Sequence, residues 1–445
     1  MARIASSNKV VLFSFFIIVI LTGSILLSFP GMWRGPHRLH YIDALFTSVS
    51  AVCVTGLVTV DTSGFTLFGQ IVILLLIQVG GLGIVTFSTI YLTGPNARIS
   101  FSSRKIINEY YIEAIEYNPR RILRNIVLLT LGIEAIGTIL LMRGFAESGE
   151  HELFFTSLFH AVSAFCNAGF SLYDDSLEGF NGNVIILVTI MILIILGGLG
   201  FVVIQDVIRK IRRGPDHHLS LHSRIMLIGS AALIFGGATL YYLFDRRAAF
   251  QNMTPAHHVL SAIFQSVTSR TAGFNAIEEN QMTMPSKALT LLLMFIGGGP
   301  GSIAGGVKVT TFFLMILVAL RTGDDQMSVK IGRRTLPSRL TARATNFIIK
   351  AMLLLGTAIG LLTVSETLIA GHHDNFMEIV FETFSAFGTV GLSLGLTPTL
   401  TWLGKIVIIL TMFAGRVGLV SLAMPAADRY RERFVSYPEG EVMIG

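Results

Sequence analysis

Four glycines recur along the chain in similar local sequence, and each follows a phenylalanine by nine or ten residues. The four stretches read FTSVSAVCVTGL from Phe46, FHAVSAFCNAGF from Phe159, FQSVTSRTAGF from Phe264 and FETFSAFGTVGL from Phe381. Glycine adopts backbone dihedrals that are closed to other residues, so it can turn nearby carbonyl oxygens toward an axis. A ring of carbonyls can replace the hydration shell of a monovalent cation. The repeated pattern therefore predicts a cation selectivity filter.

The predicted filter consists of each repeated glycine and the two residues before it. These residues are Val54, Thr55 and Gly56; Asn167, Ala168 and Gly169; Thr271, Ala272 and Gly273; and Thr389, Val390 and Gly391. Their backbone carbonyls, rather than their side chains, are the expected ligands of the ion.

Acidic residues occur five positions after the first three glycines. They are Asp61, Asp174 and Glu278, whereas the fourth stretch has Leu396 at this position. Three carboxylates at the outer mouth of a pore would raise the local cation concentration. The alternative is that they are ordinary solvated loop charges.

A glycine-rich segment interrupts an apolar stretch further along the chain and reads GGGPGSIAGGVK from Gly297 to Lys308. Glycine and proline cost about 1 and 3 kcal/mol each in a helix interior, so the segment should be unwound. Because an unwound segment can move between states at small cost, we predict that it lies across the permeation path below the filter. The segment also resembles the intramembrane gating loop of the transporter family that is named below. A kinked helix that packs through small residues is the alternative. A phosphate-binding loop is disfavoured, because Lys308 follows Val307 and no strand precedes the segment.

Charged residues inside apolar segments usually face a cavity or a partner. Arg416 lies 25 residues after Gly391, level with the glycine-rich segment. We expect its guanidinium beside the cation path, donating to carbonyls of 297–306, with a buried ion pair as the alternative. Lys308 either binds loop carbonyls or extends to the cytoplasm. Glu366 and Lys405 are predicted to extend from helix ends to the membrane surface, and Glu134 has no evident partner. The predicted gate thus comprises Gly297, Gly298, Gly299, Pro300, Gly301, Gly305, Gly306, Lys308 and Arg416.

The elements that position these residues are long apolar segments. The chain has 445 residues, of which 52% are hydrophobic and only 13% charged. Soluble domains have about 25% charged residues, so a cytosolic protein is excluded. Eight segments are long enough to span a bilayer. They are approximately residues 10–29, 68–92, 125–142, 184–205, 225–244, 288–320, 347–368 and 403–426.

Each repeated glycine lies between two apolar segments, after a stretch of about half the length of a span. The predicted fold is therefore an all-α polytopic membrane protein. It has four units of spanning helix, re-entrant pore helix and spanning helix, with the filter segments converging on one axis. The predicted units are 1–95, 96–213, 214–330 with the intramembrane gating loop 297–308, and 331–427, followed by a cytoplasmic tail, 428–445.

Positive charge predicts the orientation of the chain. Of the 33 lysines and arginines, 23 lie near the termini or in the loops between units. Basic residues concentrate on the cytoplasmic side of membrane proteins. We therefore expect a multi-pass protein of the plasma membrane with both termini in the cytoplasm.

These stretches resemble those of the Trk/Ktr/HKT superfamily of potassium transporters, and the chain is most similar to the membrane subunit of bacterial Ktr systems. The resemblance covers nearly the whole sequence and implies a single-chain pseudo-tetramer. In that family, glycine at all four filter positions accompanies potassium preference, as found here. It also implies a homodimer and a separate cytoplasmic ring of nucleotide-binding regulatory (RCK-type) subunits. Potassium would be the substrate, with sodium as a candidate activator or co-ion and no covalent cofactor.

Two functional alternatives remain open at this point. Coupled sodium/potassium symport would use the same filter as channel-like conduction. A membrane-embedded enzyme is more remote, because the sequence contains no nucleophile–base pair, no HExxH motif and no paired intramembrane aspartates. No catalytic residues, and no nucleic-acid partner, are therefore predicted.

Overall fold

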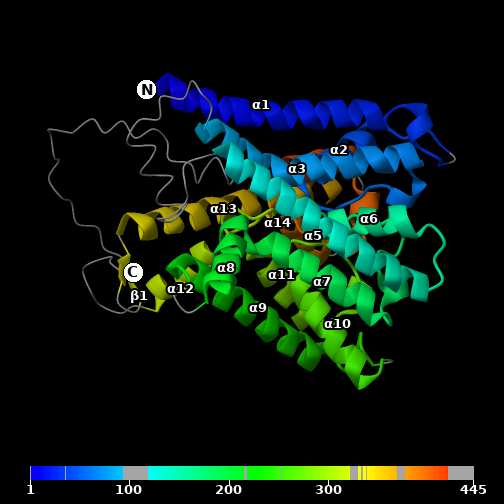
Figure 1. The fold of residues 1–445 in the computed structure, drawn as a ribbon. Helices are drawn as coiled ribbons and strands as arrows, with labels where there is room; N and C mark the ends of the chain where they lie inside the picture. Colours follow the sequence, from blue (N-terminus) through cyan, green and yellow to red (C-terminus); the bar gives the residue numbers. More distant parts are fainter. Residues whose placement is uncertain are drawn as a thin grey trace.

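The structure is a computed structural model that describes residues 2–35, 37–93, 119–214, 218–251, 253–320, 329–331, 334–336, 338–367 and 376–418. The predicted cytoplasmic tail, 428–445, lies outside these residues. Long helices lie roughly side by side in Figure 1. The order of elements recurs four times along the chain: a long helix, a short helix, a single 3₁₀ turn and a further helix.

The first recurrence comprises α1 (Ala2–Leu27), α2 (Tyr41–Cys53), η2 (Thr62–Gly64) and α3 (Leu67–Thr93), with a 3₁₀ turn η1 (Pro30–Met32) after α1. The second comprises α5 (Pro119–Glu147), α6 (Leu153–Phe165), η3 (Glu178–Phe180), α7 (Val184–Leu199) and α8 (Phe201–Arg213). The third comprises α9 (Leu221–Asp245), α10 (Pro255–Thr268), η5 (Glu279–Gln281), α11 (Met284–Phe295) and α12 (Val309–Ala319). The fourth comprises α13 (Ser338–Ser365), α14 (Phe376–Gly388), η7 (Thr397–Thr399), α15 (Trp402–Phe413) and a π-helical turn η8 (Ala414–Gly418).

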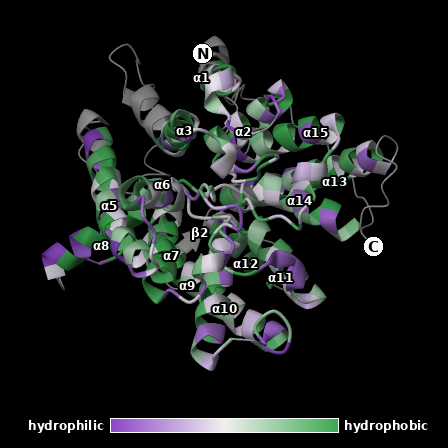
Figure 2. Ribbon diagram, turned by 90° about the vertical axis from the view of Figure 1, so that its right-hand side faces the viewer, coloured by the Kyte–Doolittle hydropathy of each residue, from purple (hydrophilic) through white to green (hydrophobic). Residues whose placement is uncertain are grey.

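The four recurrences are arranged around a centre that irregular segments occupy, as Figure 2 shows in a view along the helices. Neighbours meet in chain order: α3 contacts α5 and α6, α7 contacts α10, and α11 contacts α14. The arrangement closes because α15 contacts α2. The first and last parts of the described chain therefore pack side by side.

The short helices α2, α6, α10 and α14 have 13 or 14 residues. At 1.5 Å per residue this is about 20 Å, too short for a hydrocarbon core of about 30 Å. They are nevertheless deeply buried, and at most two residues separate the end of each from a predicted filter segment. Each short helix therefore has the length and position of a re-entrant helix.

The outer surface is apolar, as expected of a chain in lipid. Large hydrophobic side chains on the long helices are more than half exposed, including Ile18, Phe68, Ile139, Ile228 and Leu353. Three helices are long and apolar enough to cross a membrane, and these are Leu123–Glu147, Leu221–Asp245 and Leu340–Ser365. The bent pair α7 and α8 would make a fourth. The count of eight spans stays a prediction, because this test covers only the described residues.

One detail of the predicted fold is corrected. The apolar segment 184–205 is not one straight span, because α7 and α8 meet at an angle of 103°. Gly200 has a φ of 92° at the bend, a conformation that favours glycine. The all-α class of the fold is confirmed, and a small antiparallel hairpin, β1 (Val329–Ile331) and β2 (Arg334–Leu336), lies between α12 and α13. The predicted unit boundary at residue 330 lies within β1.

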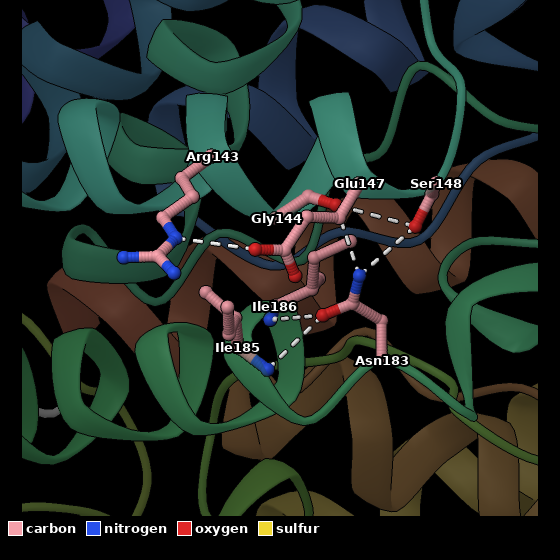
Figure 3. A network of polar contacts seen from close by, with 7 residues as sticks. All are labelled: Arg143, Gly144, Glu147, Ser148, Asn183, Ile185 and Ile186. Atoms are coloured by element: carbon pink, nitrogen blue, oxygen red, sulfur yellow. Dashed lines mark hydrogen bonds and ion pairs between the residues drawn. The ribbon is translucent and has the colours of Figure 1, made fainter.

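Side-chain caps begin α7, α9, α10 and α15. Figure 3 shows one at the start of α7, where Asn183 Oδ1 accepts from the backbone N–H groups of Ile185 and Ile186 at 3.0 and 3.2 Å. The Asn183 amide nitrogen donates at 2.9 Å to Gly144 O and to Ser148 Oγ near the end of α5. One side chain therefore caps α7 and ties it to α5.

Candidate cation pathway

The four repeated glycines form a closed ring. A side-chain Cβ at Gly56 would lie within 3.0 Å of the carbonyl oxygen of Ala168, the residue before the next glycine. The same relation joins Gly169 to Ala272 O, Gly273 to Val390 O and Gly391 to Thr55 O. Each repeated glycine therefore abuts the filter segment of the next recurrence, and the fourth abuts the first. Backbone this close leaves no room for a side chain at any of the four positions.

The backbone conformation is also the same in all four segments. The repeated glycines have φ values of 93°, 70°, 81° and 99° in chain order. Two residues earlier, Val54, Asn167, Thr271 and Thr389 have φ values between 49° and 66°. Non-glycine residues seldom adopt this left-handed conformation, which concentrates at functional sites. The chain therefore places strained residues at each of these four positions.

The residue before each glycine donates its backbone N–H to a carbonyl in the last turns of the preceding short helix. The pairs are Thr55 to Ser50 O at 2.8 Å, Ala168 to Ser163 O at 2.7 Å, Ala272 to Thr268 O at 3.0 Å and Val390 to Ser385 O at 2.9 Å. The third stretch is one residue shorter, and the donor there lies four residues after the acceptor instead of five. The missing residue is thus absorbed in the turn after α10.

The same four acceptor residues have hydroxyl side chains, and each hydroxyl makes an additional hydrogen bond to the filter segment or to the residue after it. Ser50 and Ser385 accept from the N–H groups of Gly56 and Gly391, both at 3.0 Å. In the other two recurrences, Ser163 and Thr268 donate to the carbonyls of Phe170 and Phe274, both at 2.8 Å.

The four backbone carbonyls at the ring belong to buried residues and are not occupied by hydrogen bonds from the part of the chain that the structure describes. Thr55, Ala168, Ala272 and Val390 are each 0% exposed. Within the described ranges, no hydrogen bond to the carbonyl oxygen of any of the four is found. Buried backbone carbonyls are nearly always paired, so four equivalent exceptions in one ring mark this place as a candidate site for a ligand. The C-terminal ends of the four short helices point their partial negative charge to this place, which favours a cation.

The predicted mouth acids lie on the loops that follow the ring segments, and some of them lie close to one another. Ser63 donates to Asp174, which links the first two recurrences, and Gln281 donates to Glu278 at 2.6 Å. Burial, together with the nearby charge of Asp174, raises the pKa of Asp61 above its usual value. Glu178 also belongs to this group: burial raises its pKa to about 7, and Glu278 and Asp175 contribute. Fields from neighbouring carboxylates therefore overlap at the mouth.

The glycine-rich segment is irregular from Gly297 to Lys308, between α11 and α12. It packs closely on the bend of α7: Gly299 N donates to Gly198 O at 2.8 Å, and Gly298 has no room for a Cβ beside the same carbonyl. At the other end, a Cβ on Gly305 would collide with Thr389 of the fourth filter segment. Gly301 and Gly306 have φ values of 71° and 63°, which favour glycine. Pro300 O lies close to Gly200 at the α7–α8 bend.

Arg416 is buried, at 3% exposure, and reaches this segment. Its Nη1 donates to the carbonyl of Ile303, and its Nη2 donates to Gly80 O in α3 at 3.2 Å. Lys308 Nζ donates to Ala304 O at 2.6 Å. Arg416 and Lys308 therefore both bind backbone carbonyls. For Arg416 the alternative was a buried ion pair, and for Lys308 it was extension to the cytoplasm. No acidic side chain pairs with Arg416 among the described residues.

Glycines on the helices after the filter allow close packing against the short helices. A Cβ at Gly80 would collide with Val52 O, one at Gly197 with Phe165 O, and one at Gly415 with Phe387 O. In each case the carbonyl belongs to the last turns of the preceding short helix. This contact holds the helix end at a fixed height relative to the ring.

Several polar contacts near the pathway were not predicted. Lys405 and Glu366, expected to extend to the membrane surface, both have protein partners: Lys405 forms a partly buried ion pair with Asp43 at 2.6 Å, and Glu366 accepts from Thr401 Oγ1 at 2.8 Å. Glu134, which had no evident partner, accepts from Gln78 Nε2 at 3.2 Å. Sequence alone offers no signal for pairs this distant along the chain.

A fold of apolar helices around a buried ring of carbonyls defines a membrane protein of the cation-transport class. The comparisons agree with this class. A model of the TrkH family, described as cation transport protein, matches residues 3–433. The chain is 37% identical to the Ktr system potassium uptake protein B of Vibrio alginolyticus, over 98% of this chain and 94% of that one.

Two further relatives are equally similar. The Ktr system potassium uptake protein B of Bacillus subtilis (strain 168) is 37% identical, over 97% of this chain and 95% of that one. The potassium/sodium uptake protein NtpJ of Enterococcus hirae has the same identity and the same coverage. The crystal structure of the potassium transporter TrkH from Vibrio parahaemolyticus has the same fold, with a TM-score of 0.73. It is 19% identical and covers 94% of this chain and 84% of that one.

The chain therefore belongs to the TrkH family of cation transport proteins. This confirms the resemblance to the Trk/Ktr/HKT superfamily on which the expectations above depend.

Proposed function

We propose that the chain takes up potassium through a filter of backbone carbonyls, as the membrane subunit of a Ktr-type system. The observation that carries the proposal is the closed ring of buried, unpaired carbonyls at Thr55, Ala168, Ala272 and Val390. The family narrows the class to cation transport, and the printed names of the relatives supply potassium.

The arrangement proposed for the whole chain is four units of spanning helix, re-entrant helix and spanning helix in a pseudo-tetramer. The fourfold recurrence of elements and the contact of α15 with α2 support it. The glycine-rich segment 297–308 is the proposed gate, with Arg416 as its anchor. The mouth acids Asp61, Asp174 and Glu278 would concentrate cations outside the ring.

The proposed setting is the plasma membrane with both termini in the cytoplasm, which the distribution of basic residues supports. The Ktr names of the relatives support a regulatory partner. We propose that the partner is a cytoplasmic RCK-type ring and that two copies of this chain associate.

Coupled sodium/potassium symport is a second candidate. It is favoured by the printed name of the Enterococcus relative, a potassium/sodium uptake protein. Cation flux into liposomes that contain the purified chain separates the two. Conduction predicts potassium flux that needs no sodium, whereas symport predicts potassium flux that stops when sodium is removed.

Replacing Gly56 by Ser tests the filter. Gly56 has a φ of 93°, and a side chain there would lie 2.5 Å from Ala168 O. The ring must distort, and the hydroxyl adds an extra ligand, so we expect the potassium-to-sodium flux ratio to fall by about tenfold or more. Gly236→Ser is the control, because Gly236 in α9 has open space around it. Equal flux ratios in Gly56→Ser and the parent would show that Gly56 does not line the filter.

A further inference from the structure

A buried polar side chain follows the phenylalanine of every repeated stretch. The four residues are Thr47, His160, Gln265 and Glu382, and none is more than 1% exposed. They lie in α2, α6, α10 and α14, one turn before the hydroxyls that hold the filter segments. The two sets differ in where they reach. The hydroxyls bond the filter segment or the residue directly after it, whereas three of the four polar residues bond the chain that follows it.

Glu382 has the most extensive contacts of the four. Its carboxylate accepts from Ser393 Oγ at 2.7 Å and from Thr397 Oγ1. Ser393 and Thr397 lie two and six residues after Gly391. Ser393 Oγ in turn accepts from the backbone N–H of Gly395 at 3.0 Å. The outgoing segment of the fourth recurrence, which forms no regular structure before η7, is therefore fastened to α14 by one carboxylate.

The second and third recurrences each use one of these two positions after the repeated glycine. His160 Nε2 lies 3.0 Å from the hydroxyl of Ser171, two residues after Gly169. Gln265 Nε2 donates at 2.6 Å to Glu279, six residues after Gly273. Three different side-chain chemistries thus make one kind of contact. A contact that recurs while its chemistry changes indicates that the position of the outgoing segment is what matters.

The first recurrence lacks the contact. Thr47 Oγ1 has no hydrogen-bond partner in the described part of the chain, and the residue two after Gly56 is Val58, which cannot supply one. The outgoing segment there is held differently: Trp33 and Phe65 form a bridge, and Arg34 N donates to Gly64 O at 2.8 Å. Thr47 therefore provides an internal control at an equivalent place.

We propose that His160, Gln265 and Glu382 are positioning residues that set cation selectivity by holding the outgoing segments, with Glu382 the most important. The proposal rests on the filter function proposed above. Discrimination between potassium and sodium requires carbonyls that keep their spacing, and spacing depends on both ends of each filter segment. The inner end is fixed by the helix carbonyl and hydroxyl, and Glu382 fixes the outer end in the fourth recurrence.

Packing alone would also place polar groups together in a core, so the test needs a readout beyond folding. Glu382→Met keeps the volume and removes both hydrogen bonds. We expect the potassium-to-sodium flux ratio to fall by about tenfold while potassium flux continues, because the outgoing segment loses both hydrogen bonds that fasten it to α14. Thr47→Val, the matched control, should keep the parental ratio. Glu382→Gln should give an intermediate ratio, since an amide keeps one acceptor oxygen in place of two.

The partners provide a second route if Glu382→Met does not fold. Ser393→Ala combined with Thr397→Val removes the same two bonds from the other side and should lower the ratio to the same extent. Adding these two changes to Glu382→Met should lower it no further, because all three act through one contact.

An unchanged ratio in Glu382→Met, or in the Ser393→Ala and Thr397→Val double variant, overturns the proposal. Gly391→Ser separates this failure from failure of the filter itself. If Gly391→Ser lowers the ratio and Glu382→Met does not, the filter stands and the positioning role is wrong. If neither changes the ratio, the filter assignment is wrong as well.

Discussion

The pathway has two levels that differ in how far the four recurrences agree. At the ring, the four segments share a glycine, a left-handed residue two positions earlier and a hydrogen bond to the preceding short helix. Immediately below, the four second helices differ: α3 continues, α7 bends by 103°, the third unwinds over 297–308 and the fourth becomes π-helical at 414–418.

The difference fits the roles proposed for the two levels. In the proposed filter a cation on the axis would be coordinated from all sides, so every segment would have to supply the same geometry. The proposed gate would need only one obstruction, for which the other three helices leave room. The unwound segment contacts the other three: Gly198 in α7, Thr389 beside α14, and α3 through Arg416.

The largest effect should come from shortening the unwound segment. Deleting residues 300–303 removes the carbonyl of Ile303 that Arg416 binds and part of the contact with α7. We expect cation flux to rise by about tenfold or more, with the potassium-to-sodium ratio unchanged, because the ring keeps all its own contacts. Flux into liposomes measures both quantities. Flux that is unchanged or lower in a folded deletion protein would favour the alternative of small-residue packing.

Arg416→Ala should give a smaller rise in flux. At an effective dielectric constant of about 20, two like charges about 6 Å apart repel by roughly 3 kcal/mol. In the proposed gate, the guanidinium would therefore oppose a descending cation as well as hold the segment through the Ile303 carbonyl. We expect a severalfold increase for Arg416→Ala and less for Arg416→Lys, which keeps the charge but loses the planar set of donors.

The exposed Arg143, paired with Glu147 at the outer end of α5, is the control for removal of an arginine (Figure 3). Arg143→Ala should leave flux unaltered. If Arg416→Ala also leaves flux unaltered, the residue contributes to stability rather than to closure.

The sequence predicted the repeated level better than the variable one. Each of the four glycines could be recognised because it occurs in a similar local sequence in all four recurrences. The unwound segment was visible because glycine and proline are costly in helices. The bend at Gly200 was missed, since Gly197 and Gly200 also have counterparts, Gly80 and Gly83, in a helix that stays continuous. The two glycine pairs differ in their neighbours, because the glycine-rich segment packs against Gly200 and donates to Gly197 O, whereas Gly83 lies beside Phe15 and Phe16.

Charged residues near helix ends were the least predictable. Lys405 meets Asp43 across 362 positions of sequence, where α15 packs on α2. Hydropathy predicts how deep in the membrane such a residue lies, but not the face of the helix from which its side chain projects. That face determines whether the charged group meets water or a partner on another helix. The polar residue after each phenylalanine was present in the repeated stretches. Because the four side chains differ chemically, their equivalence was recognised only from their contacts.

The outer mouth is intermediate between the two levels, with acids in three recurrences and Leu396 in the fourth, and it should give the smallest effect. Burial raises the pKa of Glu178 to about 7, with Glu278 and Asp175 adding to the shift. The side chain is therefore mostly ionised at pH 8 and mostly protonated at pH 6. Since protonation removes negative charge from the mouth, the potassium concentration for half-maximal flux should rise about twofold as the external pH falls across this range.

Glu178→Gln should remove most of this pH dependence and keep the weaker affinity of the acidic condition at both pH values. Glu147→Gln is the matched control, because Glu147 is an exposed carboxylate at the end of α5 that pairs with Arg143. Raising the salt concentration should reduce the effect in the parent, since mobile ions screen exposed charges over about 10 Å at 0.1 M. If Glu178→Gln retains the full pH dependence, the mouth charge acts through another group, and Asp61, whose pKa is also raised by burial and by Asp174, is the next to replace.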